Sequence, residues 1–285
     1  MMTEGINTVG VIGAGTMGRG IAHVAALAGY DVQLFDMVEG ATEKALLKIR
    51  DNLQKGVEKG KLDQHQMDEA LPRITHIEKL KDIKADIVIE AIVENLEIKQ
   101  KLFTYLESIL EGKAILCTNT SSMSVTKIAA GLKNPQRFVG MHFFNPAHIM
   151  KLVEVIAGAA TNEQTLNLAN SFVKSLGKVS VLAKDAPGFI VNRVARHYYV
   201  ESLRVLEEQV APVEDIDKLL EATGFKMGVF KLMDLIGVDT NFAVTSTMFN
   251  GFHQEPKFRP SRIQEQMVDA GHHGRKSGQG FYSYE

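Results

Sequence analysis

His142 lies inside an apolar stretch that runs from Arg137 to a polar stop at Asn145 and Pro146. Such a run predicts a strand. An imidazole held on a rigid strand can exchange a proton with a bound substrate near neutral pH. A single histidine in a strand is more often a hydrogen-bonded core residue, however. His142 is therefore a candidate acid or base whose role depends on finding a partner for it.

Glu154 is the candidate partner of His142. It lies inside a second apolar run, from Ile149 to Ile156, which follows the first one along the chain. A carboxylate in such a run needs a compensating group. If the two runs pair as neighbouring strands, Glu154 can reach the far nitrogen of His142 and fix its tautomer. The sequence thus predicts an acid and base dyad.

A glycine-rich turn near the N-terminus indicates a dinucleotide site. It follows a short apolar run, Thr8 to Ile12, and precedes an Ala-rich segment with helical spacing. In this context the first glycine permits a tight turn, the second lets a pyrophosphate approach, and the third lets helix and strand pack closely. The residues of the turn are Gly13, Ala14, Gly15, Thr16, Met17 and Gly18.

Asp36 indicates which dinucleotide this is. It ends a second predicted strand, Asp31 to Phe35, and follows Gly18 by 18 residues. Its carboxylate can accept both ribose hydroxyls of NAD and would repel the 2′-phosphate of NADP. NAD is the predicted cofactor. Met37 carries no charge, so some use of NADP stays open.

Strand and helix patterns alternate up to about residue 182, which predicts a parallel, doubly wound Rossmann-like sheet. Small hydroxyl residues, from Asn119 to Ser122, follow one strand at the end where such sheets bind ligands. From Lys184 onward only helical patterns and turns are found, with helices predicted over residues 189–208, 213–222, 231–236 and 263–270. We therefore predict an NAD-binding domain over residues 1–186 and an all-α domain over residues 187–285.

The composition excludes several classes of function. Among 285 residues, Lys plus Arg number 32 and Asp plus Glu 34, so the charge does not favour binding to nucleic acid or to an anionic membrane. The single cysteine, Cys117, rules out an internal disulfide framework. There is no Cys/His spacing for a metal, no signal-peptide pattern and no membrane-spanning run. We expect a cytoplasmic protein.

Seven motifs in order resemble those of the L-3-hydroxyacyl-CoA dehydrogenases, most closely the short bacterial 3-hydroxybutyryl-CoA dehydrogenases. The resemblance covers nearly the whole chain. It implies a substrate cleft between the two domains and a homodimer formed through the helical domain. The motifs lie at residues 13–18, 90–95, 119–122, 140–146, 151–154, 187–193 and 278–282.

The resemblance also implies roles for individual residues. His142 matches the family's base and Glu154 its orienting carboxylate, while Ser121 and Asn192 match ligands of the substrate oxygen. Oxidation would then transfer a hydride from C3 to NAD and the hydroxyl proton to His142. Further matches fall on the nicotinamide half of the cofactor site, at Glu94, Lys99, Ser121 and Asn145, and on the CoA contacts, at Asn52 and Lys59.

One segment departs from the family pattern. The family usually has Pro-Met-Gly-Pro-Phe-Glu where this chain reads Lys226 to Lys231, so two prolines and an acid are missing. We expect a looser turn and an unfavourable charge at the following helix N-terminus, and acyl-chain preference stays open. Two alternatives also stay open: a relative that oxidises a hydroxy acid or ring alcohol without CoA, and a dinucleotide-binding structural protein.

Overall fold

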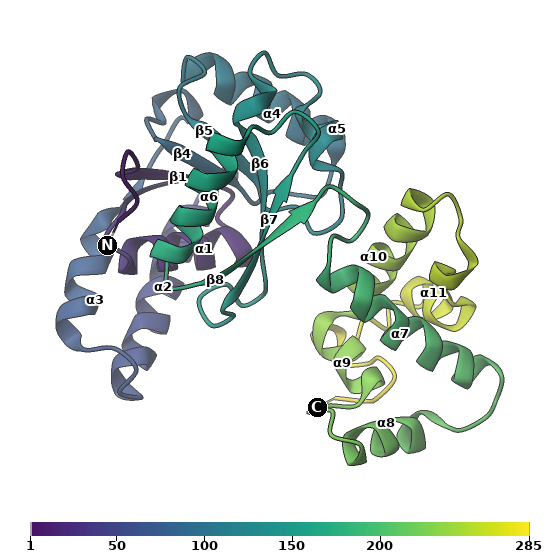
Figure 1. Ribbon diagram of the computed structural model, residues 1–285. Helices are drawn as coiled ribbons and strands as arrows, with labels where there is room; N and C mark the ends of the chain where they lie inside the picture. The colour runs from purple at the N-terminus through teal and green to yellow at the C-terminus, as the bar shows by residue number, and fades with distance from the viewer. Residues whose placement is uncertain (1, 285) are drawn as a thin grey trace. The chain divides into compact units, whose positions relative to one another are not determined.

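The computed structural model describes residues 2–284, which form two compact units divided between Asp185 and Ala186. The first unit is built on one sheet of eight strands with helices on both faces (Figure 1). The second is helical. The Rossmann-like fold followed by an all-α domain is confirmed.

The strand order of the sheet is β3-β2-β1-β4-β5-β6-β7-β8. The chain therefore winds outward from β1 in both directions, which places a topological switch point between β1 and β4. The strands are β1 (Thr8–Ile12), β2 (Asp31–Phe35), β3 (Ile74–His76), β4 (Ile87–Glu90), β5 (Ile115–Thr118), β6 (Phe138–Phe143), β7 (Leu152–Ala157) and β8 (Val179–Lys184).

One pair of strands departs from the expected parallel sheet. β6 and β7 run antiparallel, whereas the other neighbours pair in parallel. Only eight residues, 144–151, join β6 to β7. A parallel crossover needs a dozen or more residues, so this short connection requires the second strand to run back beside the first.

Helices cover both faces of the sheet (Figure 1). α1 and α6 contribute to one core with the strands, which includes Ile21 and Phe172, and Phe103 of α4 meets Phe138 edge to face at 4.7 Å between ring centroids. The helices of this unit are α1 (Thr16–Leu27), α2 (Ala41–Glu58), α3 (Gln64–Ala70), α4 (Leu96–Ile109), α5 (Val125–Ala129) and α6 (Glu163–Ser175).

The second unit packs five α-helices around Tyr199, Leu203, Phe230 and Met233. Met233 and Met248 are fully buried and fill the core, whereas Met227 and Met267 are only partly buried. The helices are α7 (Val191–Glu207), α8 (Val213–Ala222), α9 (Val229–Ile236), α10 (Val238–Gly251) and α11 (Arg262–Asp269).

The start of α7 differs from the sequence pattern, which placed it at Phe189. Phe189 has a φ of 48° and Gly188 a φ of 74°, so both residues adopt the left-handed conformation and the helix begins only at Val191. α10 was not predicted, because the side chains on its buried face include the polar residues Asn241 and Thr245.

Residues 226–231, which depart from the family pattern, are held in place by two acidic side chains of α8. Both carboxylate oxygens of Asp217 accept backbone N–H groups of α9, from Phe230 at 2.9 Å and from Lys231 at 3.0 Å. Glu221 accepts the N–H of Gly228 at 3.0 Å and pairs with the Lys231 ammonium at 2.9 Å. Two acids from α8 thus supply the negative charge that the local sequence lacks.

Candidate active site

The glycine turn leaves room for an anion at the N-terminus of α1. Gly13 has a φ of 102°, and a Cβ there would lie 2.5 Å from the carbonyl oxygen of Ala91. A Cβ on Gly18 would lie 1.7 Å from the carbonyl oxygen of Gly13. At Gly15, by contrast, a Cβ would meet nothing within 4 Å. The first and third glycines are thus required by packing, and the second faces open space in front of the helix N–H groups of Thr16 and Met17, a geometry that fits the pyrophosphate of NAD.

Asp36 is bound to the glycine turn itself. Its Oδ2 accepts the N–H of Ala14 at 2.7 Å, and its Oδ1 accepts the N–H of Val38 at 2.9 Å. Each carboxylate oxygen has a further lone pair with which to meet a ribose hydroxyl. Asp36 therefore connects the end of β2 to the turn after β1, a role that its spacing did not predict.

His142 and Glu154 are brought together by the β6 and β7 pairing. They are direct partners in the antiparallel register, and Nδ1 of His142 lies 2.7 Å from Oε2 of Glu154. Both side chains are buried, with 7% and 1% of their areas exposed. A carboxylate accepts, so Nδ1 carries the hydrogen and the lone pair of the neutral ring is on Nε2. The ring of Phe144 lies beside the imidazole, at 4.4 Å between centroids.

Lys99 and Glu94 lie in a buried polar cluster at the carboxyl ends of β4 and β5. The ammonium of Lys99 is 1% exposed and lies 2.5 Å from Oε1 of Glu90 and 3.2 Å from Oε2 of Glu94. Oε1 of Glu94 in turn accepts the backbone N–H of Ser121 at 2.9 Å and the hydroxyl of Thr120 at 2.9 Å. Three of the residues carried over by resemblance are thus part of one network.

Sequence reasoning missed Glu90, the most buried member of this cluster. Its side chain is fully buried, Oε2 accepts the hydroxyl of Thr118 at 2.7 Å, and Oε1 accepts the N–H of Ile92 at 2.8 Å. The signal was present, because Glu90 ends an apolar strand just as Glu154 lies in one. The partner, Lys99, is nine residues away on a helix, so strand periodicity could not reveal it.

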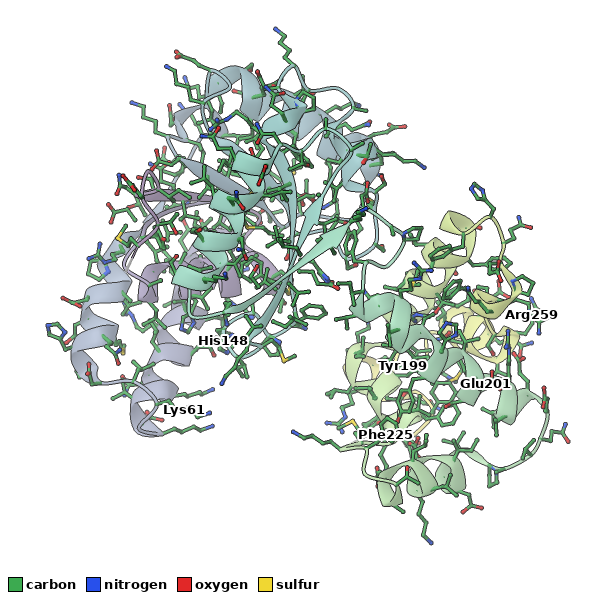
Figure 2. All side chains as sticks on the ribbon, viewed as in Figure 1. Lys61, His148, Tyr199, Glu201, Phe225 and Arg259 are labelled. Atoms are coloured by element: carbon green, nitrogen blue, oxygen red, sulfur yellow. The ribbon has the colours of Figure 1, made fainter. Side chains whose placement is uncertain are left out.

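The loop after His142 is fastened to α1. A Cβ on Gly20 would lie 2.9 Å from Cβ of Ala147, and the ammonium of Lys178 donates to the carbonyl oxygens of Ala147 at 2.7 Å and Met150 at 2.8 Å. His148, labelled in Figure 2, stacks on His23 of α1 at 5.2 Å between ring centroids. Asn145, at the start of this loop, is exposed.

The remaining predicted site residues lie on other elements. Asn52 is on α2, and Lys59 is exposed and directly follows the last residue of that helix. Figure 2 shows Lys61 at the tip of the arm that α2 and α3 form. Asn192 is the second residue of α7 and belongs to the helical unit.

Within residues 2–284, no group of three or more His, Cys, Asp or Glu side chains is arranged to hold a metal ion. In the same part of the chain, the helices are too short or too polar to cross a bilayer.

Comparison with known families gives two matches that together span most of the chain. Residues 8–186 match the NAD binding domain of 3-hydroxyacyl-CoA dehydrogenase, and residues 188–284 match its C-terminal domain.

Individual relatives match over the full chain. The 3-hydroxyadipyl-CoA dehydrogenase of Escherichia coli is 47% identical over 99% of this chain, which spans only 60% of the length of that relative. The 3-hydroxybutyryl-CoA dehydrogenase of Bradyrhizobium diazoefficiens is 41% identical, over 99% of this chain and 97% of its own. The crystal structure of (S)-3-hydroxybutyryl-CoA dehydrogenase from Ralstonia eutropha superposes with a TM-score of 0.94 at 39% identity, covering 98% of this chain and 99% of the other.

Proposed function

The chain belongs to the 3-hydroxyacyl-CoA dehydrogenase family, and we propose that it interconverts (S)-3-hydroxybutyryl-CoA and the corresponding 3-oxoacyl-CoA. Membership makes it an NAD-dependent 3-hydroxyacyl-CoA dehydrogenase. The four-carbon substrate and the residues that act on it are the proposal. The observation that carries it is the buried contact between His142 and Glu154.

In the proposed reaction, Nε2 of His142 accepts the proton of the substrate hydroxyl. Glu154, 2.7 Å from Nδ1, holds the ring in one orientation and stabilises the positive charge that the imidazole gains. The pair lies on two adjacent strands of a sheet, so its geometry is set before the substrate binds. NAD, when bound at the glycine turn, accepts the hydride from C3.

Ser121 and Asn192 are proposed to hold the oxygen on C3 as it changes from hydroxyl to carbonyl. The backbone N–H of Ser121 donates to Glu94, which fixes the start of the loop after β5. A hydroxyl and an amide can each donate to the developing carbonyl oxygen and so fix the face of C3 that is presented for hydride removal.

The two units and the arm have proposed tasks as well. We assign NAD binding to residues 1–186, and substrate enclosure and dimerisation to residues 187–285. The CoA portion is assigned to the arm, where Asn52, Lys55 and Lys59 lie on or next to α2. If Lys55→Glu and Lys59→Glu leave the KM for a CoA substrate unchanged, the arm does not bind CoA.

The decisive assay follows NADH oxidation by the purified protein with acetoacetyl-CoA. NADPH and a 3-oxo acid without CoA are run beside it. We expect turnover with NADH and acetoacetyl-CoA to exceed both alternatives. Equal rates with the free acid would instead support an enzyme that acts without CoA, and NAD binding without turnover would support a structural protein.

A second candidate substrate is 3-hydroxyadipyl-CoA, because the 47% identical relative is named for it. It differs from 3-hydroxybutyryl-CoA by a longer chain and a distal carboxylate. The ratio of kcat/KM for the two substrates, with 3-hydroxyhexanoyl-CoA as the uncharged chain of equal length, separates a preference for length from a preference for charge.

A further inference from the structure

The cluster of Glu90, Lys99 and Glu94 carries one more negative charge than positive. Lys99 supplies the single ammonium, and it lies within ion-pair distance of both carboxylates. In the part of the chain that the structure describes, no second cation lies within 4.0 Å of either one. The other partners of the two carboxylates, which include Thr118 and Thr120, are neutral donors. The cluster thus has a formal charge of one negative unit.

This charge is only partly screened by solvent, because two of the three side chains are buried. Glu90 and Lys99 have exposed side-chain fractions of 0% and 1%, while Glu94 is 41% exposed. Water and salt screen a buried charge much less than a surface charge. A ligand bound over the carboxyl ends of β4 and β5 would therefore sense the excess charge.

The position of the cluster decides which half of the dinucleotide lies nearest. Ile12, the last residue before the glycine turn, is paired with Phe35 of β2 on one side and with Glu90 of β4 on the other. Asp36 follows Phe35, so the ribose-binding carboxylate and the cluster lie on opposite sides of the turn. A dinucleotide whose pyrophosphate is at the turn and whose adenosine lies toward Asp36 must extend its nicotinamide toward Glu90.

We propose that the Glu90, Lys99 and Glu94 cluster selects the oxidised cofactor, with Glu90 as the buried positioning residue that sets the cluster's charge. The nicotinamide ring of NAD+ carries a positive charge, whereas that of NADH is neutral, so a nearby negative charge stabilises only the former. The proposal rests on the proposed function, because it takes NAD as the cofactor of this site. It adds a reason for the buried carboxylate that acid and base chemistry does not use.

Glu90→Gln tests the charge without changing the shape of the side chain. One unit charge acting over a distance on the order of 8 Å changes an affinity by roughly two- to thirtyfold, depending on how closely the medium resembles water. We expect the ratio of Kd for NAD+ to Kd for NADH to rise by a factor in that range. Calorimetry with each nucleotide alone, in the absence of acyl-CoA, measures the ratio independently of turnover.

Matched variants separate charge from geometry. Glu90→Asp keeps the charge but withdraws it from Lys99, so it should leave the ratio of the two Kd values unchanged. Glu107→Gln makes the same chemical change at a buried carboxylate near the other end of α4, where Glu107 accepts the N–H groups of Lys133 at 2.9 Å and Asn134 at 2.7 Å. It should not alter the ratio either.

Glu94→Gln provides a second test at a partly exposed position. It should move the ratio in the same direction as Glu90→Gln, by a smaller factor because solvent screens it. An unchanged ratio in both glutamine variants, or an equal shift in Glu107→Gln, would overturn the proposal. If the ratio of the two Kd values responds to the variants as expected, but the protein oxidises no 3-hydroxyacyl-CoA, the proposed function is overturned instead.

Discussion

Two buried carboxylates of the first unit and one of the second have different kinds of partner. In the first unit, Glu154 is paired with the imidazole of His142 and Glu90 with the ammonium of Lys99. In the second unit, Asp234 accepts the backbone N–H groups of Phe281 and Tyr282, each at 2.9 Å. Titratable partners are suited to chemistry, whereas backbone partners fasten one segment of chain to another.

Arg196 shows that the helical unit can also bury a cation without an acid. It is 2% exposed, and its guanidinium donates to the side chains of Asn241 at 3.1 Å and Thr245 at 2.7 Å. Burial lowers the pKa of Arg196 to about 10. No carboxylate within residues 2–284 lies within ion-pair distance of it. In this unit, neutral oxygens stabilise a charge that holds α7 against α10.

His142→Gln should give the largest effect and tests the first side of the comparison. Glutamine can retain a hydrogen bond to Glu154 but cannot exchange the proton, so turnover should fall by about two to four powers of ten. The affinity for NAD should not change, because the glycine turn and Asp36 are on other strands. Steady-state rates with acetoacetyl-CoA and calorimetry with NAD measure both quantities. Near-normal turnover would remove His142 from the mechanism.

The stability of the first unit should depend on pH through His23. Burial, His148 and Lys178 lower its pKa from 6.5 to about 4 in the folded state. As the pH falls, the unfolded chain therefore binds a proton at His23 before the folded chain does. The stability is complete above pH 6.5 and is lost as the pH falls toward 4, by up to about 3 kcal/mol.

His23→Gln should remove most of this loss, whereas His65→Gln, at an exposed position on α3, should not. Urea unfolding at pH 7.5 and pH 5 measures the difference for each protein. If the pH dependence of the wild type and of His23→Gln is the same, the buried imidazole does not control it.

Asp234→Asn tests the second side of the comparison. The amide nitrogen of the new asparagine would face a backbone N–H or a tyrosine hydroxyl that now donates to the carboxylate. We expect the free energy of unfolding to fall by about 1 to 3 kcal/mol. Cofactor affinity should be unchanged. Thermal unfolding with exposed Asp215→Asn as the control measures the loss, and a fall in NAD affinity would show that Asp234 has more than an anchoring role.

Lys231→Ala should have the smallest effect. The ion pair between Lys231 and Glu221 is exposed, and Asp217 continues to accept the N–H groups at the start of α9. We expect a change of about one to two degrees in the melting temperature. A large loss would mean that the ion pair, and not Asp217, replaces the missing prolines and acid of the family pattern.

Short-range patterns predicted much of the fold and part of the candidate site. The glycine turn, the strand before it and Asp36 follow from local spacing, and the pairing of His142 with Glu154 was inferred from two adjacent apolar runs. α10 was missed because its buried face carries Asn241 and Thr245, which serve a guanidinium 45 and 49 residues away. β3 was missed because it has only three residues.

The sequence by itself determined most of the turns and strands of the first unit, because glycine conformation, apolar runs and hydrogen-bonding side chains act over a few residues. Tertiary structure alone decided that β7 turns back beside β6, that Lys99 reaches Glu90, and that Asp217 takes the place of an acid at the start of α9. Each of these contacts depends on burial or charge that two distant segments create together, so neither segment predicts the contact alone.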